Sequence, residues 1–256
     1  MPTRDNAPLG HPCWIDLSTG DLEVSRRFYG ELLGWESTVN EEFGGYTSFT
    51  FNDLMVAGAM TKDNADMPDA WSVYLAVDDI EAALSKVDSN GGTAVMGPQE
   101  VGDLGVMAFV SDPGGAMIGM WQPGAHSGFG ILAEPQTPSW FELHTAKFDE
   151  CIAFYENVFG WTVASVGDTD EFRYSTLEDG PAAAAGVMDG SAYLPEGASA
   201  WAVYFGVANA DESAALAAKL GATQQDGIDD TPYGRLATFT DPNGAWFKLI
   251  EPPAQS

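Results

Sequence analysis

Residues 14–35 read W-I-D-L-S-T-G-D-L-E-V-S-R-R-F-Y-G-E-L-L-G-W, and residues 140–161 repeat that pattern as W-F-E-L-H-T-A-K-F-D-E-C-I-A-F-Y-E-N-V-F-G-W. The tryptophans, the Phe-Tyr pair and the Gly-Trp end are all displaced by 126 residues. A repeat of this kind marks the positions that the architecture requires. Each copy predicts a short alternating strand, followed by an amphipathic helix that ends at glycine.

The repeat continues to the end of the chain, with the offset drifting to 129 or 130 residues. Trp71 and Tyr74 match Trp201 and Tyr204, while Asp112 and Pro113 match Asp241 and Pro242. The sequence therefore predicts two homologous domains, residues 8–122 and 137–252. The proline and glycine content of residues 123–136 indicates a linker between them.

Within each half a smaller pattern also repeats. After the first helix, W-E-S-T-V, T-S-F-T-F and L-M-V-A-G-A-M predict three short strands separated by polar and glycine breaks. W-S-V-Y-L-A-V then opens a second unit, in which a helix from residue 80 is followed by three more strands. We therefore predict an α+β fold with two βαβββ units in each half.

Composition excludes several classes of partner. Among 256 residues, 45% are hydrophobic and 12% are aromatic, which is enough to build compact cores. Ten basic residues oppose 38 acidic ones, so nucleic acid and anionic membrane surfaces are not expected partners. No apolar run has the length of a membrane span, and no signal peptide is evident, so we expect a cytoplasmic protein. The spacing of Cys13 and Cys151 predicts neither a zinc knuckle nor a redox pair.

Three motifs carry a resemblance to a known family. They are D-L-E-V-S-R-R-F-Y-G-E-L-L-G-W, Y-L-A-V-D-D-I-E-A-A-L and F-V-S-D-P-G-G-A, and the second half repeats them as C-I-A-F-Y-E-N-V-F-G-W and F-T-D-P-N-G-A-W. Nearly the whole chain resembles the vicinal oxygen chelate superfamily, which contains glyoxalase I, extradiol dioxygenases, and fosfomycin and bleomycin resistance proteins. The resemblance implies two tandem glyoxalase-like domains, each with two βαβββ units paired into a half-open barrel around a ligand cleft. Pairing within halves and pairing across halves both stay open.

The metal enzymes of that family place His, Gln or Glu at inward positions on the first, fifth and eighth strands of a domain. The resemblance puts these positions at Trp14, Ser72 and Gly119, and at Trp140, Ala202 and Lys248. Indole, alkyl and ammonium groups are poor ligands for a divalent metal. The chain also has only three histidines, His11, His126 and His144. We therefore predict no metal and no cofactor.

Strand alternation predicts which side chains face the clefts. The candidate ligand-binding residues are Trp14, Asp16, Ser72, Tyr74, Met117 and Trp121 in the first half, and Trp140 and Trp246 in the second. Aromatic rings in a cleft suit a planar or cationic ligand, although the same tryptophans could simply fill the barrel. Asp16 has no basic partner on the matching strands, so it either receives a ligand amine or is solvated.

The second cleft also contains a candidate catalytic set, Glu142, His144, Tyr204 and Lys248. A buried carboxylate beside lysine and histidine is suited to proton transfer. The alternative is a structural ion pair between Glu142 and Lys248 that closes an unused cleft, with the lysine charge replacing a metal charge.

Three functions remain open at this point. The first is metal-independent binding of a planar aromatic or cationic small molecule, as the resemblance to bleomycin resistance proteins implies. The second is an enzyme of lyase, isomerase or dioxygenase type that uses the acid and base set or an unrecognised metal. The third is a regulatory protein with vestigial clefts. The expected partner is a small molecule, and the expected assembly is a monomer with pseudo-dimeric halves or a homodimer.

Overall fold

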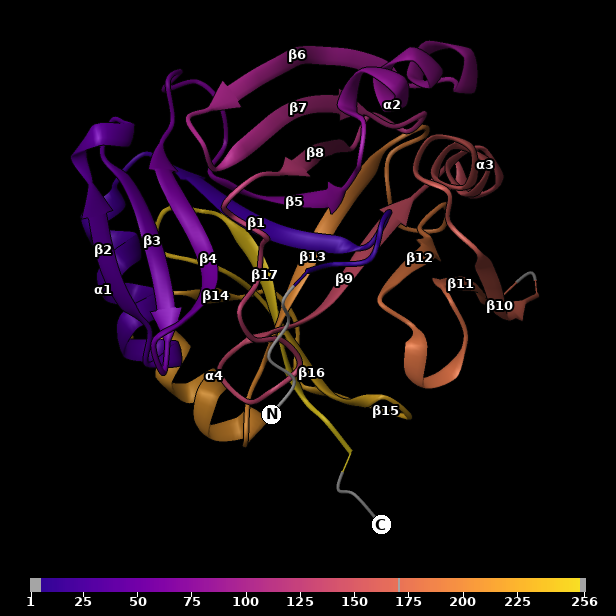
Figure 1. Cartoon of the computed structure of the whole chain (residues 1–256). Coiled ribbons are helices and arrows are strands. Elements are labelled where there is room, and N and C mark those ends of the chain that lie inside the picture. Colours follow the sequence, from indigo (N-terminus) through magenta and orange to yellow (C-terminus); the bar gives the residue numbers. More distant parts are fainter. Residues whose placement is uncertain (1–5, 170, 254–256) are drawn as a thin grey trace.

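The computed structural model describes residues 6–169 and 171–253, in which the order of a strand, a helix and three strands recurs, with one short extra strand in the last unit (Figure 1). The first half contains β1 (Pro12–Thr19), α1 (Leu22–Leu33), β2 (Glu36–Asn40), β3 (Tyr46–Phe51), β4 (Leu54–Thr61), β5 (Ala70–Ala76), α2 (Ile80–Val87), β6 (Thr93–Val101), β7 (Gly105–Ser111) and β8 (Met117–Pro123). The second half contains β9 (Pro138–Thr145), α3 (Phe148–Phe159), β10 (Val163–Asp168), β11 (Arg173–Leu177), β12 (Ala185–Asp189), β13 (Ser199–Gly206), α4 (Ala210–Lys219), β14 (Thr223–Gln224), β15 (Asp229–Thr231), β16 (Gly234–Thr240) and β17 (Trp246–Glu251). Short 3₁₀ turns η1 (Glu41–Phe43), η2 (Asp88–Asn90) and η3 (Gly180–Ala182) complete the chain.

The two βαβββ units of each half share one sheet. The first sheet has the order β2-β3-β4-β1-β5-β8-β7-β6, and the second repeats it as β10-β11-β12-β9-β13-β17-β16-β14, with β15 pairing β16. An antiparallel pair joins the units in the middle of each sheet, β1 with β5 and β9 with β13. The predicted α+β fold is therefore confirmed, and units pair within halves in two open sheets (Figure 1).

Local sequence explains where the first helix begins and ends. The Asp21 carboxylate accepts a hydrogen bond from the backbone N–H of Val24 at 3.0 Å, so it caps the first turn of α1. Gly34 ends the helix at a φ of 69°, a left-handed conformation that glycine adopts without strain. Of the apolar face that the sequence predicts at Val24, Phe28, Leu32 and Leu33, all but the half-buried Val24 are buried.

The helices pack across the two halves, because α1 lies against α4 and α2 lies against α3 (Figure 1). The Tyr29 ring stacks on Trp35 and meets Phe205 of the second half edge-on, with ring centres 5.9 Å apart. The counterpart ring, Tyr155, stacks on Trp161 at 4.8 Å. One aromatic core therefore joins both halves.

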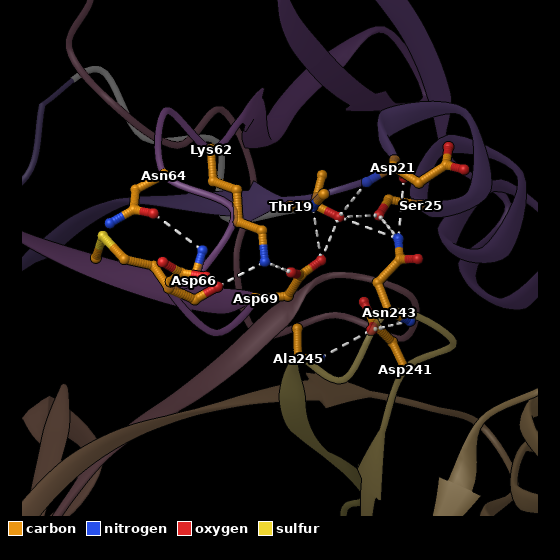
Figure 2. Close-up of polar contacts among 12 residues, drawn as sticks. Thr19, Asp21, Ser25, Lys62, Asn64, Asp66, Asp69, Asp241, Asn243 and Ala245 are labelled. Carbon is orange, nitrogen blue, oxygen red and sulfur yellow. Dashed lines mark hydrogen bonds and ion pairs between the residues drawn. The ribbon is translucent and has the colours of Figure 1, made fainter.

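The Asp-Pro motifs form hydrogen bonds across this junction, and Figure 2 shows the contacts around Asp241 and Asn243. Tyr29 donates its hydroxyl to Asp241 across the junction at 3.0 Å, and Asn243 donates to the carbonyl of Asp21 and to the Ser25 hydroxyl. The reciprocal contact runs from Tyr155 to Asp112 at 3.3 Å. The motif that identifies each half therefore also holds it to the other half.

The structure also describes the helices and the two cysteines in terms of membrane spanning and thiol chemistry. Within the described part of the chain, no helix has the length and apolar character needed to cross a membrane. Cys13 and Cys151 are buried free thiols, and burial raises the pKa of the Cys151 thiol to about 12. Neither thiol is therefore ionised near neutral pH.

Candidate functional site

The predicted site residues lie on the inner face of each sheet, opposite the shared aromatic core. On β1, Ile15 and Leu17 are fully buried in the core, whereas the Trp14 indole donates to the Asp16 carboxylate on the other face at 3.0 Å. We define the first inner face as Trp14, Asp16, Tyr46, Ser72, Tyr74, Met117, Gly119 and Trp121. The second inner face comprises Trp140, Glu142, His144, Tyr174, Tyr204, Trp246 and Lys248.

Strand register explains how the second inner face is assembled. Tyr204 on β13 lies between Trp140 on β9 and Lys248 on β17, so its side chain sits at the centre of three strands. Two residues along the same strands, Glu142 on β9 pairs with Ala202 on β13. The small alanine side chain leaves space for the carboxylate above the sheet. This register brings all four candidate catalytic residues together.

A tyrosine hydroxyl bridges the acid and the base in this cluster. Tyr204 donates to Glu142 Oε1 at 2.5 Å and accepts from Lys248 Nζ at 2.8 Å. Tyr174 donates to the second carboxylate oxygen at 2.7 Å. The ion pair expected between Glu142 and Lys248 is present at 3.8 Å, but it is looser than either bond to the Tyr204 hydroxyl.

His144 connects this cluster to the surface. Its Nε2 atom lies 2.9 Å from Glu142 Oε1 and 3.3 Å from Lys248 Nζ. Its Nδ1 atom lies 2.5 Å from the hydroxyl of Tyr193, a residue that is 59% exposed. The imidazole thus stands between a buried carboxylate and a hydroxyl at the solvent boundary.

The charges of the cluster are set by competition between burial and pairing. Burial alone would raise the pKa of Glu142, but the hydrogen bond and charge of His144 and the charge of Lys248 lower it to about 2. Burial lowers the pKa of Lys248, and Glu142 opposes this effect only in part. Glu142 is therefore ionised near neutral pH, while the Lys248 ammonium group loses its proton more readily than that of a surface lysine.

Aromatic side chains surround the cluster and remain partly accessible. Trp140 and Trp246 are half-buried, and Lys248 Nζ lies 5.5 Å from the centre of the Trp246 ring. Tyr193 approaches His144 from the edge, and Phe172, which is 40% exposed, stacks on Tyr174. The second inner face therefore has a polar floor and an aromatic rim.

The first inner face is covered by the linker. Trp14 is only 4% exposed, because the His126 ring stands edge-on to it at 4.5 Å and Phe129 packs beside it at 5.5 Å. Trp121 is also buried and donates its indole N–H to the backbone carbonyl of His126. At this end of the sheet, the tryptophans fill space rather than line an accessible cleft.

Asp16 sits in this covered face without a basic partner among the described residues. Burial raises its pKa, although hydrogen bonds from Tyr46, Tyr74 and Trp14 act in the opposite direction. The Tyr46 hydroxyl donates to Asp16 Oδ1 at 2.6 Å, so tyrosine and indole groups already occupy this oxygen. Of the other predicted residues, Ser72 is half-buried and Met117 is 42% exposed.

The inward positions implied for a metal do not form a donor set. In the first half, the Tyr74 ring covers Gly119 so closely that an added Cβ would lie 2.3 Å from it. In the second half, the Lys248 ammonium faces Glu142, and only that carboxylate and His144 are conventional ligands. No group of three His, Cys, Asp or Glu residues within 6–169 and 171–253 has the spacing to hold a metal ion.

Two cavities lie outside the polar clusters. One of about 330 Å³ is formed between α2 and the end of α3, and residues such as Ala83 and Phe159 line it. A smaller one of about 70 Å³ is bordered by Trp140, Leu132 and Ala184. The first is on the helical side, whereas the second extends from the edge of the second inner face towards the linker.

Sequence reasoning missed the tyrosines that complete both carboxylate sites. Tyr46 and Tyr174 are 128 residues apart, an offset between those of the first and later landmarks, so extending the repeat to these positions would have found them. Each bonds the inner-face carboxylate of its own half, Asp16 or Glu142. Tyr193 lies in a loop and gives no such signal.

These features define a class of protein, and comparison with known families identifies it. The family model described as the Glyoxalase/Bleomycin resistance protein/Dioxygenase superfamily matches residues 11–120 and 137–249, so the chain belongs to this superfamily. The two matched regions correspond to the two sheets.

The curated relatives extend over both halves. The chain is 37% identical over 262 residues to the Mycobacterium tuberculosis protein named "Putative glyoxylase CFP32", and the match covers 100% of each chain. It is 33% identical to the anthracycline biosynthesis protein DnrV of Streptomyces peucetius, covering 94% of this chain and 93% of that one.

Solved structures share the fold at low sequence identity. The 2,3-dioxygenase LapB from Pseudomonas sp. KL28 superposes with a TM-score of 0.68 at 16% identity, covering 95% of this chain and 92% of that one. The Mn(II)-bound glyoxalase from Novosphingobium aromaticivorans gives 0.66 at 16% identity, covering 95% and 82%.

Proposed function

We propose that the second inner face binds a planar aromatic small molecule without a metal ion. The observation that carries this proposal is the aromatic rim around a polar floor, where half-buried Trp140 and Trp246 and exposed Tyr193 offer ring surface to a ligand. Stacking on such rings contributes about 1 kcal/mol per pair beyond the area that it buries.

The charges of the floor favour a neutral or weakly acidic ligand over a cation. Glu142 is already neutralised by Lys248, and its oxygens accept hydrogen bonds from two tyrosines. A cationic ligand would have to compete with the ammonium group at 3.8 Å. Relatedness to an anthracycline biosynthesis protein is consistent with a planar aromatic ligand.

The donor set supports the proposed metal independence. The lysine ammonium occupies the place where a cation would be attracted to Glu142, and two like charges at that distance repel each other. Elemental analysis of protein purified without chelators tests this part of the proposal. Stoichiometric zinc, manganese, nickel or iron would overturn it.

The binding experiment uses tryptophan fluorescence with 2-naphthalenemethanol, a planar and uncharged probe. We expect saturable quenching, and we expect Trp246→Leu to weaken binding by about tenfold, or about 1.4 kcal/mol. The matched control is Met117→Leu at the equivalent position of the first half, which leaves affinity unchanged. Absence of saturable quenching, or weakening by Met117→Leu alone, contradicts binding at the second inner face.

A proton-transfer enzyme is the second candidate, and one specific observation favours it. Contacts run without a break from Glu142 through His144 to the exposed Tyr193 hydroxyl. Such a path is what a general acid and base needs in order to exchange protons with water. On this hypothesis, Glu142→Gln abolishes turnover while the protein stays folded, whereas a structural ion pair predicts a loss of stability alone.

A further inference from the structure

Lys248 supplies a primary amine to the second inner face, and its surroundings suit covalent chemistry. Its side chain is 13% exposed, so Nζ lies at the base of the site rather than in solvent. The rings of Tyr204 and Trp246 flank Nζ at 4.8 and 5.5 Å. A lysine that is largely removed from solvent and flanked by aromatic rings is the type of residue that forms Schiff bases with carbonyl compounds.

We propose that Lys248 forms a Schiff base with an aromatic aldehyde or ketone held on the second inner face. The proposal names the ligand class of the binding site described above, so it rests on that proposed function. It also gives a role to a lysine that stands where the metal enzymes of the superfamily carry a ligand.

The first step needs a neutral amine, and the structure provides a route for the departing proton. When its imidazole is neutral, His144 accepts one proton from the ammonium group through Nε2, which lies 3.3 Å from Nζ. The imidazolium that results is stabilised by Glu142 Oε1 at 2.9 Å. Burial of Lys248 assists this transfer because it lowers the pKa of the amine.

The remaining steps balance without any other reagent. The Nζ electron pair attacks the carbonyl carbon, and one Nζ proton moves to the carbonyl oxygen to give a neutral carbinolamine. His144 then returns its proton to the hydroxyl group, which leaves as water while the nitrogen electron pair forms the C=N bond of a protonated imine. One ammonium group and one carbonyl compound thus become one iminium ion and one water, with no oxidant or reductant.

Two tyrosines have distinct supporting roles. Tyr204 holds Nζ through the 2.8 Å hydrogen bond and is itself fixed by Glu142, so it aims the amine at the ligand. Tyr193 contacts Nδ1 of His144 from the exposed side and links the imidazole to solvent. Both are positioning residues, because neither forms a bond with the carbonyl carbon.

The test is reductive trapping with 2-naphthaldehyde and sodium cyanoborohydride, read by intact mass and peptide mapping. We expect a single naphthylmethyl group on Lys248, formed faster than on the other four lysines. Lys248→Arg keeps the charge and should remove this labelling, whereas Lys86→Arg, at an exposed lysine far from the site, should not. Labelling spread evenly over all lysines contradicts the proposal.

The rate and the binding readout separate this proposal from the proposed function. We expect His144→Gln to slow trapping by a saturating concentration of 2-naphthaldehyde about 100-fold. If the alcohol binds but the aldehyde is not trapped on Lys248, Schiff base formation is wrong and aromatic binding stands. If neither compound binds, both are wrong.

Discussion

The first and second inner faces derive from one template but differ in how each treats its central carboxylate. In the first, Asp16 accepts hydrogen bonds from Trp14 and Tyr46, has no basic partner among the described residues, and has a raised pKa. In the second, Glu142 contacts His144 and Lys248 and has a pKa of about 2. The same backbone register therefore supports one carboxylate with a raised pKa and one whose pKa is lowered by two neighbouring bases.

Three substitutions between the halves account for this difference. Glu142 has one methylene more than Asp16. His144 and Lys248 stand where the first half has Ser18 and Gly119. Because Tyr204 and Tyr74 are common to both halves, the bases rather than the tyrosines decide whether the carboxylate is charged.

The largest expected effect comes from replacing the central carboxylate of each inner face with an amide and comparing the two losses of stability. Glu142→Gln leaves the buried Lys248 ammonium without its partner and should lower the free energy of unfolding by about 3 kcal/mol at neutral pH. Asp16→Asn should change it by less than about 1 kcal/mol, because burial already favours the uncharged carboxyl group. Urea unfolding followed by circular dichroism measures both, and equal losses would contradict the comparison.

The pH dependence of the same two variants should run in opposite directions. The pKa of Glu142 falls from 4.5 to about 2 on folding, so its contribution is present above pH 4.5 and is lost as the pH falls towards 2. The stability advantage of the wild type over Glu142→Gln should shrink by roughly 3 kcal/mol over this range.

The pKa of Asp16 is raised above 3.8 on folding, so its contribution is present below pH 3.8 and is lost as the pH rises through the folded pKa. Asp16→Asn should therefore gain stability relative to the wild type as the pH rises. Unfolding curves across the acidic range for wild type and both variants test the two signs. Parallel profiles for the two variants would show that the inner faces do not differ in charge.

The sequence was sufficient for the fold because the repeat and the hydrophobic alternation are local signals. The helix from Leu22 to Gly34 and the inward alternation of Trp14 and Asp16 follow from spacing alone. The pairing of units within halves was not predictable, since a β-strand sequence does not specify which strand lies beside it.

The site was partly predictable for the same reason. Glu142, His144, Tyr204 and Lys248 lie on regular strands, so alternation placed them on one face. The covering of Trp14 by His126 and the contact of Tyr193 with His144 depend on the path of loops, which no short-range pattern encodes. These loop contacts cover Trp14 in the first half and join His144 to an exposed hydroxyl in the second.

Gly119 offers a smaller test of how the first face is filled. Because the Tyr74 ring lies 2.3 Å from where a Cβ would be, Gly119→Ala should displace the ring and cost about 2 kcal/mol of stability. Gly97→Ala, at a strand glycine with open space around it, is the matched control and should cost less than about 0.5 kcal/mol. Thermal unfolding of the pair checks this, and equal midpoints would mean that Tyr74 yields freely.

The smallest effect concerns the linker itself. His126→Gln removes the edge-on contact with Trp14, which contributes about 1 kcal/mol at most. Stability should therefore change little, but acrylamide should quench tryptophan fluorescence more efficiently than in the wild type, because the Trp14 ring loses part of its cover. Unchanged quenching would show that Phe129 alone shields Trp14. The cover over Trp14 would then depend on one linker residue rather than on both His126 and Phe129.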